Sequence, residues 1–266
     1  MSRLAGKVAV VLGAAGRDNM GQAIARRFVE EGAQVVVGGR GEDSLRTFAA
    51  QIQGRYAMCD ITRKADVAAL ARTAVEAHGR VDIAVNCTGW GLMAKLRDTT
   101  EEQIDRLMDL QFKGTYFFLQ VFAEQLAAGG GGSIITTSSA SVYALLFNHA
   151  AYIGTKAGAD ALMRCFANEY GARNVKVNSL APGLTSTPMT EKEMNLPGLQ
   201  EAFLKEYPLG RIGTAADVAN AALWLASGES FVTGQVLQVN GGLTLRRNPL
   251  PREINASLAA AATPRA

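Results

Sequence analysis

Short runs of apolar, β-branched residues alternate along the chain with longer segments in which apolar residues recur at helical spacing. A continuous apolar run predicts a strand covered on both faces, whereas recurrence every three or four positions predicts an amphipathic helix. Strands are expected at 8–12, 35–37, 81–85, 133–137, 175–180 and 235–239, and helices at 21–31, 43–53, 64–78, 101–127, 151–171 and 215–226. This alternation predicts an α/β fold with a mostly parallel, doubly wound sheet.

No break in composition and no long linker divides the chain, so residues 1–245 are expected to form a single domain. Residues 246–266 contain three prolines and an alanine run at 259–262. We expect them to form a C-terminal tail that is either disordered or packed on a neighbouring subunit.

Composition narrows the functional classes. The net charge of +3 over 266 residues is too small and too dispersed to indicate a nucleic-acid partner. The three cysteines form no C-x-x-C pair and the chain has only two histidines, so no metal site is expected. No signal peptide is recognisable, and no stretch approaches the ~20 apolar residues of a membrane span. We therefore expect a cytoplasmic protein without a membrane partner.

A glycine-rich turn at residues 13–21 joins the first predicted strand to the first helix. Glycines let the backbone approach a pyrophosphate, and a helix N-terminus supplies N–H groups and a positive dipole end. Alone, the turn favours phosphate binding only moderately, the alternative being that its glycines serve conformation alone. The second strand is followed by Arg40, where enzymes that prefer NAD often carry an acidic residue. Because a guanidinium can pair with a 2′-phosphate and Arg17 can add a second charge, the sequence favours NADP(H) over NAD(H).

Tyr152 and Lys156 share one face of the helix expected around 150–172, about 6 Å apart. A cation at that distance favours the phenolate by roughly 2.8 kcal/mol at an effective dielectric near 20, which lowers the phenol pKa by about two units. Such pairs are also common on helix surfaces. Ser139 precedes the tyrosine by 13 residues, and the three side chains together predict general acid/base chemistry.

Together these features resemble the short-chain dehydrogenase/reductase family as far as about residue 245. The matching segments are the glycine turn, 59–61, 86–89, Ser139 with Tyr152 and Lys156, 178–187, 208–213 and 234–242. The resemblance implies a single-domain Rossmann-type sheet of about seven strands flanked by helices. It also implies hydride transfer between a nicotinamide and a carbinol carbon.

The resemblance further implies individual roles. Tyr152 would be the general acid/base, Ser139 would orient the substrate oxygen, and Lys156 would bind the cofactor ribose and lower the pKa of the tyrosine. Gln111 stands where the family usually has an asparagine that holds a water behind the lysine. The implied cofactor-binding residues are Gly13, Gly16, Arg17, Asn19, Met20, Gly21, Arg40, Asp60, Ile61, Asn86, Gly89, Tyr152, Lys156, Pro182, Gly183, Thr185 and Thr187.

Three departures from the family pattern leave alternatives open. Gln111 either supports the proton relay with shifted geometry, slows it, or is only a helix residue. The glycine turn is two residues longer than usual and resembles that of the enoyl-thioester reductase branch, whose tyrosine would stand at His149. Because that position is a histidine, carbonyl or alcohol chemistry is preferred. Cys87 lies in an Asn-Cys-Thr-Gly segment that replaces the family's Asn-Asn-Ala-Gly and indicates no role of its own.

The substrate pocket that the resemblance implies is apolar and aromatic, which favours a neutral, fairly hydrophobic ketone or secondary alcohol. Its candidate residues, each with core or lid packing as the alternative, are Trp90, Met93, Ser141, Leu146, His149 and Met189. Small residues along the helix at 151–171 would let another helix approach closely, and the resemblance implies association through this helix as a homotetramer or homodimer. The alternative is that these residues pack only against the chain's own sheet. The leading hypothesis is an NADP(H)-dependent ketone reductase or alcohol dehydrogenase. The alternatives are an enoyl reductase on the same fold and a cofactor-binding regulator or scaffold with impaired turnover.

Overall fold

Seven parallel strands form the central sheet of the computed structural model, which describes residues 2–188 and 190–262. The order across the sheet is β3-β2-β1-β4-β5-β6-β9, and the chain reverses direction of winding between β1 and β4. This confirms the predicted α/β fold with a doubly wound sheet. The strands are β1 Val8–Leu12, β2 Gln34–Gly39, β3 Arg55–Met58, β4 Ile83–Asn86, β5 Gly132–Thr137, β6 Val175–Pro182 and β9 Val236–Val239.

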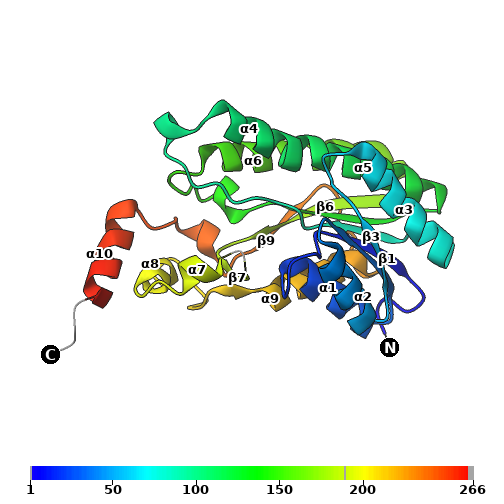
Figure 1. Cartoon of the computed structure of the whole chain (residues 1–266), viewed down its shortest axis with the longest axis horizontal. Helices are drawn as coiled ribbons and strands as arrows, with labels where there is room; N and C mark the ends of the chain where they lie inside the picture. The colour runs from blue at the N-terminus through cyan, green and yellow to red at the C-terminus, as the bar shows by residue number, and fades with distance from the viewer. Residues whose placement is uncertain (1, 189, 263–266) are drawn as a thin grey trace.

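Helices cover both faces of the sheet (Figure 1). On one face lie α1 (Met20–Glu30), α2 (Glu42–Gln51) and α9 (Ala215–Ala226), and on the other α3 (Lys64–His78), α4 (Glu101–Leu107), α5 (Gly114–Ala128) and α6 (Ala150–Tyr170). Each face has its own buried core, and successive residues of β1 point alternately into the two. Strands buried on both faces explain the continuous apolar runs of the sequence. None of the helices in the described residues is long and apolar enough to cross a membrane.

Within the central sheet and the helices that cover it, two elements differ from the sequence prediction. Strand β3 was not located, because it lies at the sheet edge and its residues are only partly buried or exposed. The single helix expected at 101–127 is interrupted by a π-helical turn at Met108–Lys113, which carries Gln111. Such turns insert one extra residue into a helix and are frequent at functional sites.

A small lobe stands beyond the carboxyl ends of β6 and β9. It contains α7 (Glu191–Met194), α8 (Leu199–Leu204), the short pair β7 (Thr185–Ser186) and β8 (Gly213–Thr214), and α10 (Pro251–Ala262). Its core includes Phe203, Tyr207 and Leu243. Figure 1 shows this lobe beside the open end of the sheet, with α10 at its outer side.

The C-terminal segment is more ordered than the sequence indicated. Residues 251–262 form α10, which packs against α8 of the same chain and places Ile254 against the lobe core. Arg247 donates two hydrogen bonds to Glu253, at 2.8 and 2.7 Å, and Asn248 Nδ2 donates to the Ala144 carbonyl at 2.5 Å. The disordered alternative therefore does not hold for 251–262, because proline at the first helical position and the alanine run form a helix. Packing on a neighbouring subunit stays a prediction.

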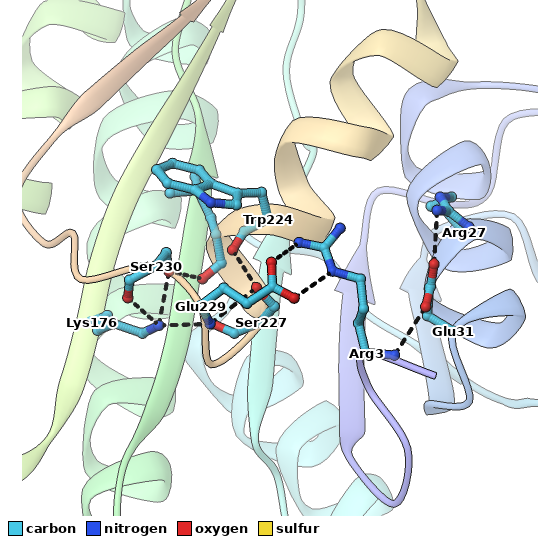
Figure 2. A network of polar contacts seen from close by, with 9 residues as sticks. Arg3, Arg27, Glu31, Lys176, Trp224, Ser227, Glu229 and Ser230 are labelled. Atoms are coloured by element: carbon cyan, nitrogen blue, oxygen red, sulfur yellow. Dashed lines mark hydrogen bonds and ion pairs between the residues drawn. The ribbon is translucent and has the colours of Figure 1, made fainter. Parts of the chain in front are cut away.

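Polar contacts gather at the opposite end of the sheet, where its strands begin (Figure 2). Arg3 pairs with Glu229 through its guanidinium and with Glu31 through its backbone N–H. Lys176, at the start of β6, donates to the Ser230 hydroxyl at 3.0 Å and to two carbonyl oxygens of the same loop. These contacts join the N-terminal segment, α1 and the loop after α9 at the end of the sheet remote from Tyr152.

Candidate active site

The glycine-rich turn forms a close-packed cradle between β1 and α1. Gly13 adopts a left-handed φ of +99°, and a Cβ there would lie 2.8 Å from the Cys87 carbonyl carbon. A Cβ on Gly21, in the first turn of α1, would lie 2.7 Å from the Gly13 carbonyl oxygen. Only glycine therefore allows β1, the segment after β4 and the start of α1 to approach one another. A helix N-terminus brought so close to the strand ends suits the pyrophosphate of a dinucleotide.

The extra length of the turn is accommodated by Asn19 and by two side chains that the sequence analysis did not single out, Asp18 and Gln22. Asp18 takes a left-handed φ of +50°, and its backbone N–H donates to Gln22 Oε1 at 2.9 Å. Gln22 is buried, and its amide also donates to the Ala14 carbonyl. Asn19 caps α1 through the Gln22 N–H and donates to the Gly13 carbonyl at 2.8 Å. The longer turn is thus held in one conformation by hydrogen bonds between its own residues and the start of α1. Met20 begins α1 and packs against the core beneath.

The two arginines considered for a 2′-phosphate differ in position. Arg40 is exposed directly after β2, and its positive charge acts on the carboxylate of Asp60, at the corresponding end of β3. Burial raises the pKa of Asp60, but hydrogen bonds from Thr62 and the charge of Arg40 lower it overall. The Arg17 side chain is 94% exposed and pairs with Asp18 at 3.3 Å. Arg40 is therefore better placed than Arg17 to meet an adenosine ribose.

The remaining cofactor candidates line the carboxyl ends of β4 and β6. Asn86 is buried, and its Oδ1 accepts hydrogen bonds from the N–H and the hydroxyl of Thr88. Pro182 ends β6 and Thr185 begins β7, while Thr187 bonds to Thr190. Gly89 and Gly183 lie on the turns at these strand ends and Gly16 on the turn after β1, whereas the Ile61 side chain is buried in the core.

Three side chains converge where β5 meets α6. Ser139 follows β5 and is a hydrogen-bond partner of the Tyr152 hydroxyl. Lys156, 5% exposed, donates from Nζ to the Thr137 carbonyl at 2.6 Å, and Nζ lies 5.9 Å from the centroid of the Tyr152 ring. The side-chain hydroxyls of Ser139 and Ser141 are 2.8 Å apart. The predicted grouping of serine, tyrosine and lysine is therefore present in space.

The acidity of the tyrosine differs from the expectation. Burial raises the pKa of Tyr152 above its ordinary value of 10, although the hydrogen bond with Ser139 opposes this. Burial also lowers the pKa of Lys156 to about 8. The predicted lowering of the tyrosine pKa is wrong for this state of the protein, because the low dielectric around both groups disfavours both charged forms. Tyr152 is a protonated phenol at neutral pH and can serve as a proton donor.

Gln111 occupies a bridging position. It is 2% exposed, its Oε1 accepts the Trp90 backbone N–H at 3.1 Å, and its Nε2 donates to Thr155 Oγ1 at 2.7 Å. Thr155 in turn donates to the Tyr152 carbonyl. The amide therefore ties the segment after β4 to the first turns of α6. A Cβ added to Gly89 would lie 3.4 Å from Gln111 Oε1 and 3.7 Å from Lys156 Nζ, so the lysine is close by.

The predicted substrate residues fall into different environments. His149 lies edge-on to the Tyr152 ring, with centroids 6.2 Å apart, and its Nδ1 bonds to the Phe147 carbonyl. Leu146 packs against the lobe core, and Met93 is 71% exposed. The Trp90 ring lies under the guanidinium of Arg106 on α4, at 4.1 Å. Met189 lies outside the described residues.

One buried acid near the site was missed by sequence reasoning. Asp160 is 3% exposed on α6 and accepts a hydrogen bond from Ser138 Oγ at 2.6 Å. Its position, four residues after Lys156 and eight after Tyr152, already placed it on the same helix face.

Known proteins resemble this chain along most of its length. A family model described as enoyl-(acyl carrier protein) reductase matches residues 13–244. The chain is similar to the 3-oxoacyl-(acyl-carrier-protein) reductase of Thermotoga maritima, with 34% identity over 91% of this chain and 100% of that protein. It is also similar to the L-fucose dehydrogenase of Oryctolagus cuniculus, with 36% identity over 93% of this chain and 88% of that protein. The structure of a short-chain type dehydrogenase/reductase from Mycobacterium ulcerans superposes with a TM-score of 0.89, at 32% identity, over 96% of this chain and 98% of that one.

Proposed function

Because the chain belongs to the short-chain dehydrogenase/reductase family, we propose that it is an NADP(H)-dependent oxidoreductase that interconverts a ketone and a secondary alcohol. The observation that carries the proposal is the meeting of Ser139, Tyr152 and Lys156 beside the glycine cradle. A hydroxyl that orients an oxygen, a phenol that exchanges a proton and an ammonium nearby form a site for carbonyl chemistry.

The cofactor would lie across the carboxyl ends of the strands. The cradle of Gly13 and Gly21 would receive its pyrophosphate, Arg40 its 2′-phosphate, and Lys156 the hydroxyls of the nicotinamide ribose. When bound, the nicotinamide supplies or accepts the hydride. The preference for NADP(H) rests on Arg40, which is exposed at the end of β2 with no acidic side chain in that position.

In the direction of reduction, the chain's own groups handle the proton. Ser139 would donate a hydrogen bond to the substrate carbonyl and hold it against the Tyr152 hydroxyl. Tyr152 then gives up its proton to the carbonyl oxygen, and the positive charge of Lys156 stabilises the phenolate left behind. The raised pKa of Tyr152 supports this direction at neutral pH, since the phenol carries the proton that reduction consumes.

The substrate is proposed to be neutral and fairly hydrophobic. The lobe core that includes Phe203 and Tyr207 also receives Leu146 from the segment before α6, so apolar side chains adjoin the reacting groups. Exposed apolar side chains continue outward at Met93, Leu145 and Phe147. The homotetramer and the cytoplasmic location stay predictions.

The test is a panel of ketones and matched enones with NADPH and NADH, followed through the absorbance of the reduced nicotinamide. Wild-type protein is expected to reduce at least one ketone. Tyr152→Phe should lower kcat by about 10²-fold or more while NADPH binding, measured by fluorescence, is retained. Tyr116→Phe, a half-exposed tyrosine on α5, is the matched control and should leave kcat unchanged. Equal rates for wild type and Tyr152→Phe would refute the proposal.

A further inference from the structure

Helix α6 is joined to the end of β5 by contacts at successive residues. Lys156 Nζ donates to the Thr137 carbonyl at 2.6 Å, and the Tyr152 hydroxyl pairs with Ser139. Both of these contacts involve groups of the proposed chemistry. The residue between Thr137 and Ser139 makes a third contact with the same helix face, and the proposed chemistry does not use it.

That third contact is a buried carboxyl group, whose pKa burial raises while its hydrogen bonds oppose that rise. Ser138 Oγ donates to Asp160 Oδ2 at 2.6 Å, a separation typical of a hydroxyl that donates to an ionised carboxylate. The two residues are 4% and 3% exposed, and Ser179 is a second hydrogen-bond partner of the carboxylate. A carboxylate at this depth is costly unless its oxygens are hydrogen-bonded and a cation lies near.

The nearby cation is Lys156, one helical turn before Asp160. The ionisable groups that face its ammonium are Asp160 on α6, Tyr152 on the same helix and the Cys87 thiol from the segment after β4. Burial raises the pKa of Cys87 to about 12, so the thiol is neutral and Asp160 is the formal negative charge among the three. Arg164 is a further cation that acts on Asp160. Burial lowers the pKa of Lys156 to about 8, and the attraction of Asp160 opposes that change.

We propose that Asp160 is a positioning residue of the active site: its carboxylate holds Ser138, so that the end of β5 keeps its register against α6, and its charge keeps Lys156 an ammonium. The catalytic meaning of this inference rests on the proposed function. The claim that Asp160 controls the protonation of Lys156 does not depend on that function, because this protonation can be measured without cofactor or turnover. Without the charge of Asp160, Lys156 must release its proton at lower pH, since burial then acts unopposed.

The direct test is the NMR titration of Lys156 in protein with isotope-labelled lysine, the signal being assigned with Lys156→Met. The wild-type midpoint is expected near pH 8. Asp160→Asn keeps an acceptor for Ser138 but removes the charge, and it should lower the midpoint by about one to two pH units. Ser138→Ala is the matched control, which removes the hydrogen bond and keeps the charge, and it should leave the midpoint in place. An unshifted midpoint in Asp160→Asn overturns the proposal.

A kinetic arm separates this inference from the proposed function. If the wild type reduces a ketone, Asp160→Asn should move the alkaline limb of its kcat/KM profile to lower pH by the same amount. Ser138→Ala should lower kcat without moving that limb. If the wild type reduces no carbonyl compound, the proposed function fails, and the NMR midpoints still decide whether Asp160 controls Lys156.

A third measurement covers the case in which Asp160→Asn does not fold. In wild-type protein, the Lys156 signal should shift a second time at acidic pH, as Asp160 takes up its own proton. A Lys156 signal that stays constant through the acid range in which the protein remains folded would overturn the proposal.

Discussion

Replacing Gln111 by asparagine, the residue that the family pattern expects, should destabilise this protein. Gln111 reaches the Trp90 N–H at 3.1 Å and Thr155 Oγ1 at 2.7 Å from inside a π-helical turn. Asparagine is shorter by one methylene and cannot span both partners from the same backbone position. Two hydrogen bonds at about 1 kcal/mol each are lost, so Gln111→Asn should cost about 2 kcal/mol.

This loss of stability corresponds to a measurable fall in the melting temperature, Tm. A chain of 266 residues has an unfolding entropy of about 0.56 kcal/mol per kelvin, so about 2 kcal/mol corresponds to a fall in Tm of about 4 °C. Differential scanning calorimetry of the protein without cofactor measures this fall. Gln51→Asn makes the same chemical change at an exposed position at the end of α2, and it should lower Tm by less than about 1 °C.

A functional readout accompanies the stability measurement. Because the amide joins the segment after β4 to the turn of α6 that carries Tyr152, Gln111→Asn should also lower kcat for the ketone identified in the panel. If Tm is unchanged in both Gln111→Asn and Gln51→Asn, the two hydrogen bonds of the Gln111 amide contribute nothing to stability, and the reasoning is refuted.

Two other regions give predictions that can be checked separately. Arg40→Asp should lower kcat/KM for NADPH by about 10- to 100-fold and shift the preference towards NADH, because a charge-assisted pair with the 2′-phosphate is replaced by repulsion. Arg17→Ala, whose side chain is 94% exposed, is the control with a smaller effect, and equal losses from both variants would count against the assignment. At α10, hydrogen bonds from Arg247 lower the pKa of Glu253 from 4.5 to about 2. A lowered carboxyl pKa stabilises the fold fully above pH 4.5 and no longer does so once the pH has fallen through about 2. The hydrogen-exchange protection of residues 246–262, corrected for the intrinsic exchange rate at each pH, should therefore fall across that interval. Arg247→Ala should remove this acid-dependent step, and a step of the same size in the variant would contradict the assignment.

The core of the fold was predictable from local pattern because its strands are buried on both faces. Strand β1 matched the predicted range at both ends, and α3 and α9 did so as well. Strand β3 was not located, since an edge strand of Arg55, Tyr56, Ala57 and Met58 carries little apolar signal. The π-helical turn could not be foreseen either, because an extra residue in a helix depends on how its side chains pack against α6.

The site was predictable as a set of residues and less so as an electrostatic environment. Spacing located Ser139, Tyr152 and Lys156, since helical periodicity and the positions of strand ends determine which side chains lie close together. The pKa of Tyr152 was predicted in the wrong direction, because a sequence gives the distance to Lys156 but not the depth of burial. Gln22 and Asp160 were missed for a similar reason. A polar side chain on a helix is predicted to face solvent unless its buried hydrogen-bond partners are known.

Helix α10 brings residues 251–262, far from Tyr152 in sequence, against the lobe beyond the ends of β6 and β9. Through Asn248 and Ala144 this segment is attached to one wall of the lobe, and through α8 to another, while the glycine cradle lies elsewhere. If the proposed substrate meets this lobe, substitutions within residues 246–262 should change substrate choice more than cofactor recognition. For directed evolution, this makes residues 246–262 a compact library target, and for purification it favours a tag at the other terminus.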